Sequence, residues 1–391
     1  MNDSFLFQFL GVCHIFNNNG LVLHCMFIKN YSYEVARLMV LFLMLVSTKT
    51  EAQIDSINDF KLALNGYIET YYLYDFDNPG NHDRPNFYVS HDRHNELNLN
   101  IGMLRFAAEN KKVKTALALM TGSYVNANLA YEPGVLKNIY EANVSVKLNS
   151  KKDLWLQAGI FNSHIGFESA IGADCYTLSR SIAADNSPYY ESGLRLNYKS
   201  KNTNWDLSFF VLNGWQRIQR LDNNTMPSFG TQITYSAKNT TFNSSNYFGN
   251  EGTDKLPTWR YFHNFYMVSN LGASSKLIVG LDVGLQQYPI KSNIIYWWSP
   301  QVVYRYQMSK KFAIAGRIEN YFDKDAVITL PIKNAQLNVI GMAVNLDCKI
   351  INNVLFRIEF KQLNNSDQIF EKNNSLTHYN SSVAGAFTVK F

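Results

Sequence analysis

Hydrophobic and polar residues alternate along most of this chain, as expected for β-strands whose two faces meet different surroundings. In residues 354–361 the even positions carry valine, phenylalanine and isoleucine, whereas the odd positions carry leucine, arginine, glutamate and lysine. Residues 96–103 follow the same rule, with Leu97, Leu99, Ile101 and Met103 on the expected apolar face. Each of these segments predicts a strand with one apolar and one polar face.

Sixteen such segments can be counted along the chain. They lie at residues 62–74, 96–108, 113–125, 139–148, 154–161, 189–199, 205–214, 228–237, 240–248, 259–270, 276–288, 298–308, 312–322, 336–348, 354–363 and 380–391. Most exceed the roughly 5–6 residues of an average strand and match the about 9–11 residues that a tilted strand needs to cross lipid. Short and long links alternate between them, and tyrosine and tryptophan gather at strand ends. The pattern predicts an all-β fold, a single antiparallel transmembrane β-barrel of about sixteen strands, with fourteen to eighteen left open.

A soluble sandwich would show the same alternation, but the strand lengths and the aromatic residues at strand ends favour the barrel, and the composition agrees with it. Charged residues make up 17% of the chain, below the roughly 25% of a typical soluble domain. The mean hydropathy is only −0.20, and no segment reaches the about 18 apolar residues of a transmembrane helix. The net charge is +5 without any long run of like charges, so nucleic-acid binding is not indicated.

The N-terminal part has the features of an export signal. Residues 38–46 form an apolar run, which Lys29 and Arg37 precede, and a small-x-small site ends at Ala52. We expect cleavage after Ala52, which divides the chain into a leader at 1–52 and a barrel at 53–391. Because 52 residues are too many for a signal peptide, we also expect translation to begin at Met26.

The sequence offers little support for catalysis, a metal or a cofactor. His91 and His94 lie at a loop-to-strand junction without a third ligand nearby, so we expect no metal site. No G-x-S-x-G motif is present, although His263 and Ser269 share one strand face and leave a barrel hydrolase as an alternative. We therefore expect no catalytic residues and no cofactor.

Four cysteines occur in the whole chain, without a C-x-x-C motif. Removal of the leader would leave Cys175 and Cys348, as two reduced thiols or as a disulfide.

Several blocks of residues resemble one family. Residues 64–72 read Leu-Asn-Gly-Tyr-Ile-Glu-Thr-Tyr-Tyr, and residues 89–100 read Val-Ser-His-Asp-Arg-His-Asn-Glu-Leu-Asn-Leu-Asn. A long link is framed by Gly-Ile-Phe at 159–161, Gly-Phe-Glu-Ser at 166–169 and Asn-Ser-Pro-Tyr-Tyr-Glu-Ser-Gly at 186–193. Over residues 60–391 the chain resembles the OmpL-like β-barrel porins of Gram-negative bacteria. The resemblance implies an outer-membrane barrel with a porin-like role and brings no catalytic residues.

A porin needs a water-filled lumen lined by fixed charges. The polar strand faces supply the pore-lining candidates Glu69, Glu96, Glu141, Glu191, Arg195, Asp282, Arg305, Arg317, Glu319, Arg357 and Glu359. The longest link, 162–188, either lies on the surface or folds into the lumen, where Glu168 and Arg180 would be constriction charges. Both signs of charge occur, so we expect weak ion selectivity, although interior pairs could instead brace a closed barrel.

The expected function is passive diffusion of ions and small polar solutes across the cell outer membrane. A non-channel barrel, either a membrane-embedded hydrolase or a plugged structural barrel, is the alternative. The expected partners are outer-membrane lipid and the outer-membrane assembly machinery, for which Phe391 at the end of an apolar strand face resembles the signal. A homo-oligomer is a further possibility.

Overall fold

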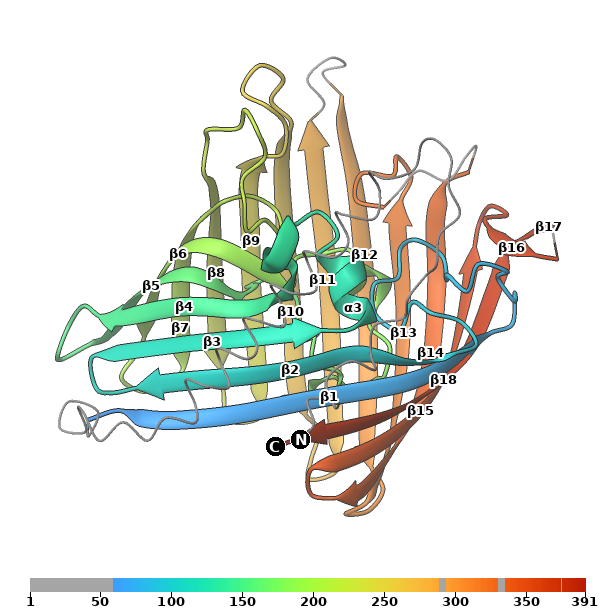
Figure 1. Ribbon diagram of the computed structural model, residues 1–391, viewed down its shortest axis with the longest axis horizontal. Coiled ribbons are helices and arrows are strands. Elements are labelled where there is room, and N and C mark those ends of the chain that lie inside the picture. Colours follow the sequence, from blue (N-terminus) through green and yellow to red (C-terminus); the bar gives the residue numbers. More distant parts are fainter. Residues whose placement is uncertain (1–58, 288–292, 330–334, 374) are drawn as a thin grey trace, which may run out of the picture. The chain divides into compact units, whose positions relative to one another are not determined.

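The computed structural model describes residues 59–287, 293–329, 335–373 and 375–391. Within these residues, sixteen strands close into one antiparallel β-barrel, in which β1 (Lys61–Asp75) pairs with β18 (Tyr379–Lys390) (Figure 1). The other strands of the barrel are β2 (Leu97–Glu109), β3 (Val113–Thr121), β4 (Ile139–Lys147), β5 (Asp153–Asn162), β6 (Tyr190–Lys199), β7 (Trp205–Leu212), β8 (Ser228–Ser236), β9 (Thr240–Asn250), β10 (Trp259–Asn270), β11 (Ser275–Gln287), β12 (Ile294–Gln307), β13 (Phe312–Asp323), β14 (Leu337–Ile351) and β15 (Val354–Asn365). The expectation of an all-β barrel of about sixteen strands is confirmed.

The predicted leader and its cleavage site lie outside the described residues and stay predictions. No helix in the described part of the chain is long and apolar enough to cross a membrane.

Two short elements of the long links were not expected from the sequence. The third predicted strand ends at Thr121 rather than at 125, because Gly122 adopts φ 130° and the helix α3 (Ser123–Asn128) follows. A hairpin of β16 (Phe370–Lys372) and β17 (Ser375–Thr377) lies in the link before β18. Such local turns lack the two-residue rhythm that revealed the barrel strands.

The barrel reverses the distribution of a soluble protein. Leucine, phenylalanine and isoleucine side chains on the outward positions of the strands are exposed, whereas charged side chains on the inward positions are buried. In β15, for example, Ile358 is 43% exposed and Arg357 is fully buried. Lipid is the surrounding that makes this arrangement favourable, because it accepts apolar side chains while the interior hydrates or pairs the polar ones.

One face prediction fails in β2. Glu69 pairs with Ile101 and Thr70 pairs with Leu99, so Asn100 is an extra residue that forms a β-bulge. The bulge exchanges the two faces of the strand: Leu99 lies before it on the outward side, and Ile101 lies after it, fully buried within the barrel. A strict two-residue count from Leu97 therefore placed Ile101 and Met103 on the wrong face.

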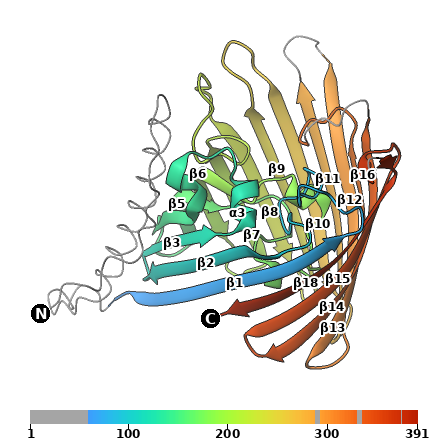
Figure 2. The ribbon, with the colours of Figure 1, turned by 45° about the vertical axis from the view of Figure 1, so that its right-hand side comes forward.

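The barrel closes where the end of the chain meets β1. The Gly66 amide donates to the Phe391 carbonyl over 2.7 Å, and the Phe391 amide donates to the Gly66 carbonyl over 3.1 Å. The Phe391 ring lies over Gly66 on the outward face and is 61% exposed (Figure 2 shows this end of the chain beside β1). Gly66 leaves the space that the ring fills, a pairing that helps to define strand register.

A methyl group at Gly66 should weaken this closure. A Cβ there would lie 2.1 Å from Cζ of Phe391, so the ring must leave its place. We expect Gly66→Ala to lower the free energy of unfolding by about 1 kcal/mol, the size of a strong cross-strand contact. Urea unfolding of the protein in lipid vesicles measures this change.

Gly385→Ala is the matched control, since Gly385 also faces outward on the neighbouring β18. Its Cβ would meet nothing closer than 3.8 Å, so little change is expected. Equal effects of the two substitutions would contradict the role of the Phe391 ring.

Candidate functional site

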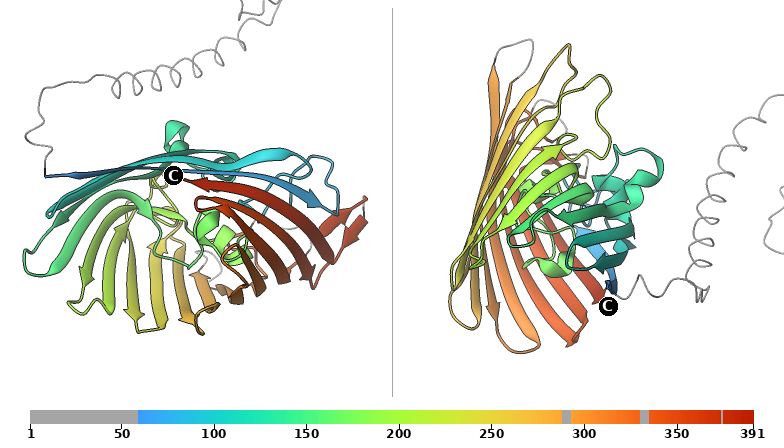
Figure 3. Two further views of the ribbon diagram at one scale, coloured as in Figure 1. Left: turned by 90° about the horizontal axis from the view of Figure 1, so that it is seen from below. Right: turned by 90° about the vertical axis from the view of Figure 1, so that its left-hand side faces the viewer.

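The longest link enters the barrel. Residues 163–189, here called the inner loop, join β5 to β6 and carry the 3₁₀ helix η2 (Gly172–Asp174) and the helix α4 (Ile182–Asp185). Figure 3 shows α4 within the ring of strands. Of the two placements considered for this link, the structure has the one inside the lumen.

The inner loop is first held where it leaves β5. His164 contacts Glu191 of β6 through Nδ1 at 2.9 Å and the Asn246 carbonyl through Nε2 at 2.8 Å. The Gly166 amide donates to Asn264 Oδ1 on β10 over 3.1 Å. Glu191, a pore-lining candidate, is thus fully buried beneath the start of the loop.

Arg317 of β13 is the most connected residue beneath the loop. Its guanidinium lies 3.2 Å from Glu319 Oε1 and 3.3 Å from Glu168 Oε1. It also donates to the carbonyls of Ser179 over 2.7 Å and Arg180 over 2.8 Å. Every one of these partners except Glu319 belongs to the inner loop, so Arg317 fastens the loop to the barrel wall.

Charged residues on β14 and β15 continue this attachment. Arg357 contacts Asp347 Oδ1 and the Gly172 carbonyl, each at 2.7 Å. Glu359 accepts from the Ser179 amide over 3.2 Å, and Lys361 Nζ lies 3.3 Å from Glu319. We call this set the charged wall; it comprises Arg317, Glu319, Asp347, Arg357, Glu359 and Lys361, all of them buried.

The two constriction candidates are both buried in these contacts. Arg180 donates to the carbonyls of Ser169, Ala170 and Leu178 over 2.6–2.8 Å and is fully buried. The Glu168 side chain, only 3% exposed, accepts from the Ser181 amide over 2.9 Å besides contacting Arg317. Arg180 therefore braces the fold of the loop from within.

Burial also shifts the pKa values of two side chains within the inner loop. Burial raises the pKa of the Asp185 carboxyl, an effect that Arg180 partly offsets. Burial likewise raises the pKa of the Cys175 thiol. Cys175 and Cys348 are both free, so the disulfide alternative is wrong for this structure.

A second buried network lies at β1. Glu69 contacts His91 Nε2 at 2.9 Å and accepts from Asn100 Nδ2 over 2.6 Å and from Tyr67 Oη over 2.5 Å. His94 points elsewhere and accepts from the Asp75 amide over 2.9 Å. No group of three or more potential metal ligands occurs in the described ranges, and the two histidines do not converge.

On the opposite side of the lumen, the strand halves near the short turns are less covered, whereas Glu191, Phe210 and Leu212 nearer the long links are buried. The Arg105 side chain is 34% exposed and pairs with Glu141. Arg195 donates to Ser208 Oγ over 3.1 Å and stays partly exposed. We call the partly exposed, inward-facing set on β2 and β4–β8 the open wall; it comprises Arg105, Asn143, Gln157, Arg195, Asn197, Asp206, Gln232 and Thr234.

The remaining candidates lie apart from both walls or between them. Asp282 of β11 is buried and accepts from Asn264 Nδ2. Arg305 of β12 pairs with Asp347, with 20% of its side chain exposed. Glu96 lies just before β2 at the barrel mouth and pairs with Arg93 at 3.0 Å.

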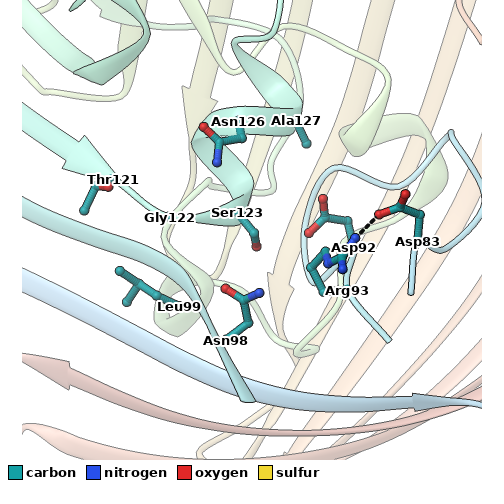
Figure 4. Close-up of a pocket in the computed structure, with 10 residues that line it drawn as sticks. All are labelled: Asp83, Asp92, Arg93, Asn98, Leu99, Thr121, Gly122, Ser123, Asn126 and Ala127. Carbon is teal, nitrogen blue, oxygen red and sulfur yellow. Dashed lines mark hydrogen bonds and ion pairs between the residues drawn. The ribbon is translucent and has the colours of Figure 1, made fainter. Parts of the chain in front are cut away.

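A cavity of about 560 Å³ opens beside this mouth cluster (Figure 4). Polar side chains from the link before β2, together with Ser123 and Asn126 of α3, line it. Arg93 is already paired with Asp83 and Glu96, so it contributes no unpaired charge to the cavity.

His263 and Ser269 do not contact one another. His263 faces outward from β10, with Nε2 3.4 Å from Ser244 Oγ, whereas Ser269 lies 3.0 Å from Thr240. Pairing registers place Thr231, Asn246 and His263 side by side on three adjacent strands. This outward polar row lies between exposed aromatic residues such as Phe248 and Phe265.

Sequence reasoning identified the charged faces but not their division into two walls. The open wall includes Arg105, Asn143, Gln157 and Gln232, which were not among the pore-lining candidates. Arg105 could have been found had the bulge at Asn100 been recognised, because the bulge turns Arg105 inward.

Solved structures share this architecture at low sequence identity. The outer membrane channel DcaP of Acinetobacter baumannii has a TM-score of 0.58 and 10% identity, covering 88% of this chain and 99% of its own. OmpT, an outer membrane protein of Vibrio cholerae, has a TM-score of 0.54 and 7% identity over 88% of this chain and 100% of its own. OmpF of Salmonella typhi, in complex with daunomycin, has a TM-score of 0.54 and 9% identity, covering 85% of this chain and 98% of its own. At these identities the likeness concerns the fold.

The family is shown by sequence. No curated protein matches the chain. A family model described as "Putative beta-barrel porin-2, OmpL-like" matches residues 61–391, which is the entire barrel. The chain therefore belongs to this OmpL-like porin family and is a β-barrel of the outer membrane.

Proposed function

We propose that this protein is a passive diffusion channel for ions and small polar solutes, and not an enzyme. The observation that carries the proposal is the unequal burial of the two lumen walls. The inner loop covers the charged wall completely, whereas the open wall keeps polar side chains partly exposed. The start of the loop also contacts β6, β8 and β10, but the strand halves near the short turns keep room for water along the open wall.

The open wall suits a channel of weak selectivity. Arg105 and Arg195 contribute positive charge, and Asp206 and the Glu141 partner of Arg105 contribute negative charge. Of the two pore-lining candidates at this wall, Glu141 is buried against Arg105, and we place the more exposed Arg195 beside the solute path. Arg317, Glu319, Arg357 and Glu359 instead hold the inner loop, so their influence on permeation is indirect.

Conductance in planar lipid bilayers tests this function. The purified protein should insert in discrete steps, each with a stable current. Arg195→Glu should move the reversal potential in a salt gradient toward cation selectivity, because it replaces a positive by a negative charge at the open wall.

Lys255→Glu is the matched control, since it makes the same charge change in an exposed link. It should leave the reversal potential nearly unchanged. A protein that inserts without conducting would contradict the channel and favour a plugged barrel. Conduction with equal effects of both variants would contradict the place given to Arg195.

We also propose that the barrels associate as a homo-oligomer through the outward polar row of Thr231, Asn246 and His263. Polar side chains that face hydrocarbon are costly unless another protein surface meets them. A structure of OmpT of Vibrio cholerae, at a TM-score of 0.54 and 8% identity, is described as a trimer form. A second copy of the chain would supply polar partners for the row.

The mass of the protein–detergent complex tests this association. We expect an oligomer for the natural chain and single barrels after combined Thr231→Val, Asn246→Leu and His263→Leu substitution. Phe265→Leu, on the same face, should leave the oligomer intact. A natural chain that is monomeric would contradict the proposal.

The proposed contacts with the assembly machinery involve Phe391. Phe391 directly follows β18, and its ring is 61% exposed on the outward side, where a recognising protein would reach it.

A further inference from the structure

The short-turn end of the barrel carries a marked excess of lysine. The seven short turns that join successive strands lie at residues 110–112, 148–152, 200–204, 237–239, 271–274, 308–311 and 352–353. They contain no aspartate or glutamate and eight lysines, namely Lys111, Lys112, Lys151, Lys152, Lys201, Lys238, Lys310 and Lys311. In outer-membrane barrels short turns face the periplasm, so this end is the periplasmic one.

A cavity of about 230 Å³ lies at this end, between the turns and the inner loop. Its cationic lining consists of Arg305, Lys310, Lys311, Lys349 and Lys390, and Ala173 of the inner loop borders it. We call this cavity the basic vestibule.

Strand geometry directs these cations toward the lumen. Lys349 and Lys390 lie two positions after Asp347 and Thr388 and so share their strand faces, and Asp347 and Thr388 are inward residues only 3% and 2% exposed. The strand ends also meet, because the Lys349 amide donates to the Lys311 carbonyl over 2.8 Å. The basic vestibule is therefore a feature of the lumen and not of the lipid-facing surface.

The carboxylates near the vestibule are already ion-paired. Asp347, the one acidic residue in the lining, contacts both Arg305 and Arg357. Asp174 of the inner loop pairs with Lys390. Lys310, Lys311 and Lys349 form no ion pair within the described part of the chain, and all three are exposed.

We propose that the basic vestibule binds small phosphate-bearing anions in solution and concentrates them at the periplasmic mouth. This inference rests on the proposed channel function and names a solute class for it. Ammonium groups are compact charges with several donors, which suits the acceptor oxygens of phosphate. Charge of one sign in a cleft with low-dielectric walls focuses the field and enriches counter-ions. The volume of the vestibule is several times that of one water molecule, about 30 Å³, so a phosphate group fits with part of its hydration shell.

Inorganic phosphate is the probe for the test. Single-channel current through the natural chain is recorded in chloride at low ionic strength, with phosphate added to each chamber in turn. We expect phosphate to reduce the chloride current at a lower concentration from one side than from the other. Combined Lys310→Gln, Lys311→Gln and Lys349→Gln substitution should raise that concentration by about tenfold, the lower end of the enrichment that focused charge produces.

The matched control is combined Lys151→Gln, Lys152→Gln and Lys201→Gln substitution, which removes three turn lysines that do not line the vestibule. It should change the effective phosphate concentration little. Equal weakening by both triple variants would overturn the site in favour of diffuse surface charge. Loss of the phosphate effect when anionic lipid is added to a neutral bilayer would also overturn it, because headgroups would then occupy the cavity. A natural chain without conductance would refute the channel itself, which is a separate outcome.

Discussion

Arginine cannot shed its charge inside a protein, and the barrel interior is arranged around that constraint. Arg317 and Arg357 project from the strands into a fully buried region, where an unpaired charge would cost about 3–5 kcal/mol or more. Carboxylates of the strands, Glu319 and Asp347, meet part of the demand, and the inner loop meets the rest through Glu168 and backbone carbonyls. The loop thus lies against β13–β15 because its backbone completes the coordination of these guanidinium groups.

The asymmetry of the lumen follows from this attachment. On one side of the barrel the charged side chains hold the loop, and on the other side Arg105, Arg195 and their polar neighbours stay partly accessible. The part of the loop that carries η2 also borders the basic vestibule, since Ala173 lines this cavity and Asp174 pairs with Lys390. A single loop therefore shapes both the solute path and its periplasmic entrance.

The strands could be read from the sequence because alternation is a local property of the chain. The destination of the inner loop could not, because contacts such as Arg317 with Ser179 join residues 138 positions apart. Local exceptions to the rhythm were hidden as well: the bulge at Asn100 turned Ile101 and Arg105 inward. That Phe391 meets Gly66 also depends on the register between β1 and β18, which the sequence alone does not give. Hence the polar faces were predictable, whereas their division into a covered and an open half was not.

Labelling of introduced cysteines by a water-soluble thiol reagent tests the division of the lumen most directly. The background carries Cys348→Ser, and Cys175 is buried, with burial raising the pKa of its thiol. Cysteines at Gln157 and Asn197 should be labelled in the folded protein, whereas cysteines at Ala315 and Ala343, two small and buried inward positions beside the charged wall, should not. Equal labelling at all four positions, or protection of all four, would contradict a loop that covers one wall and leaves the other to water.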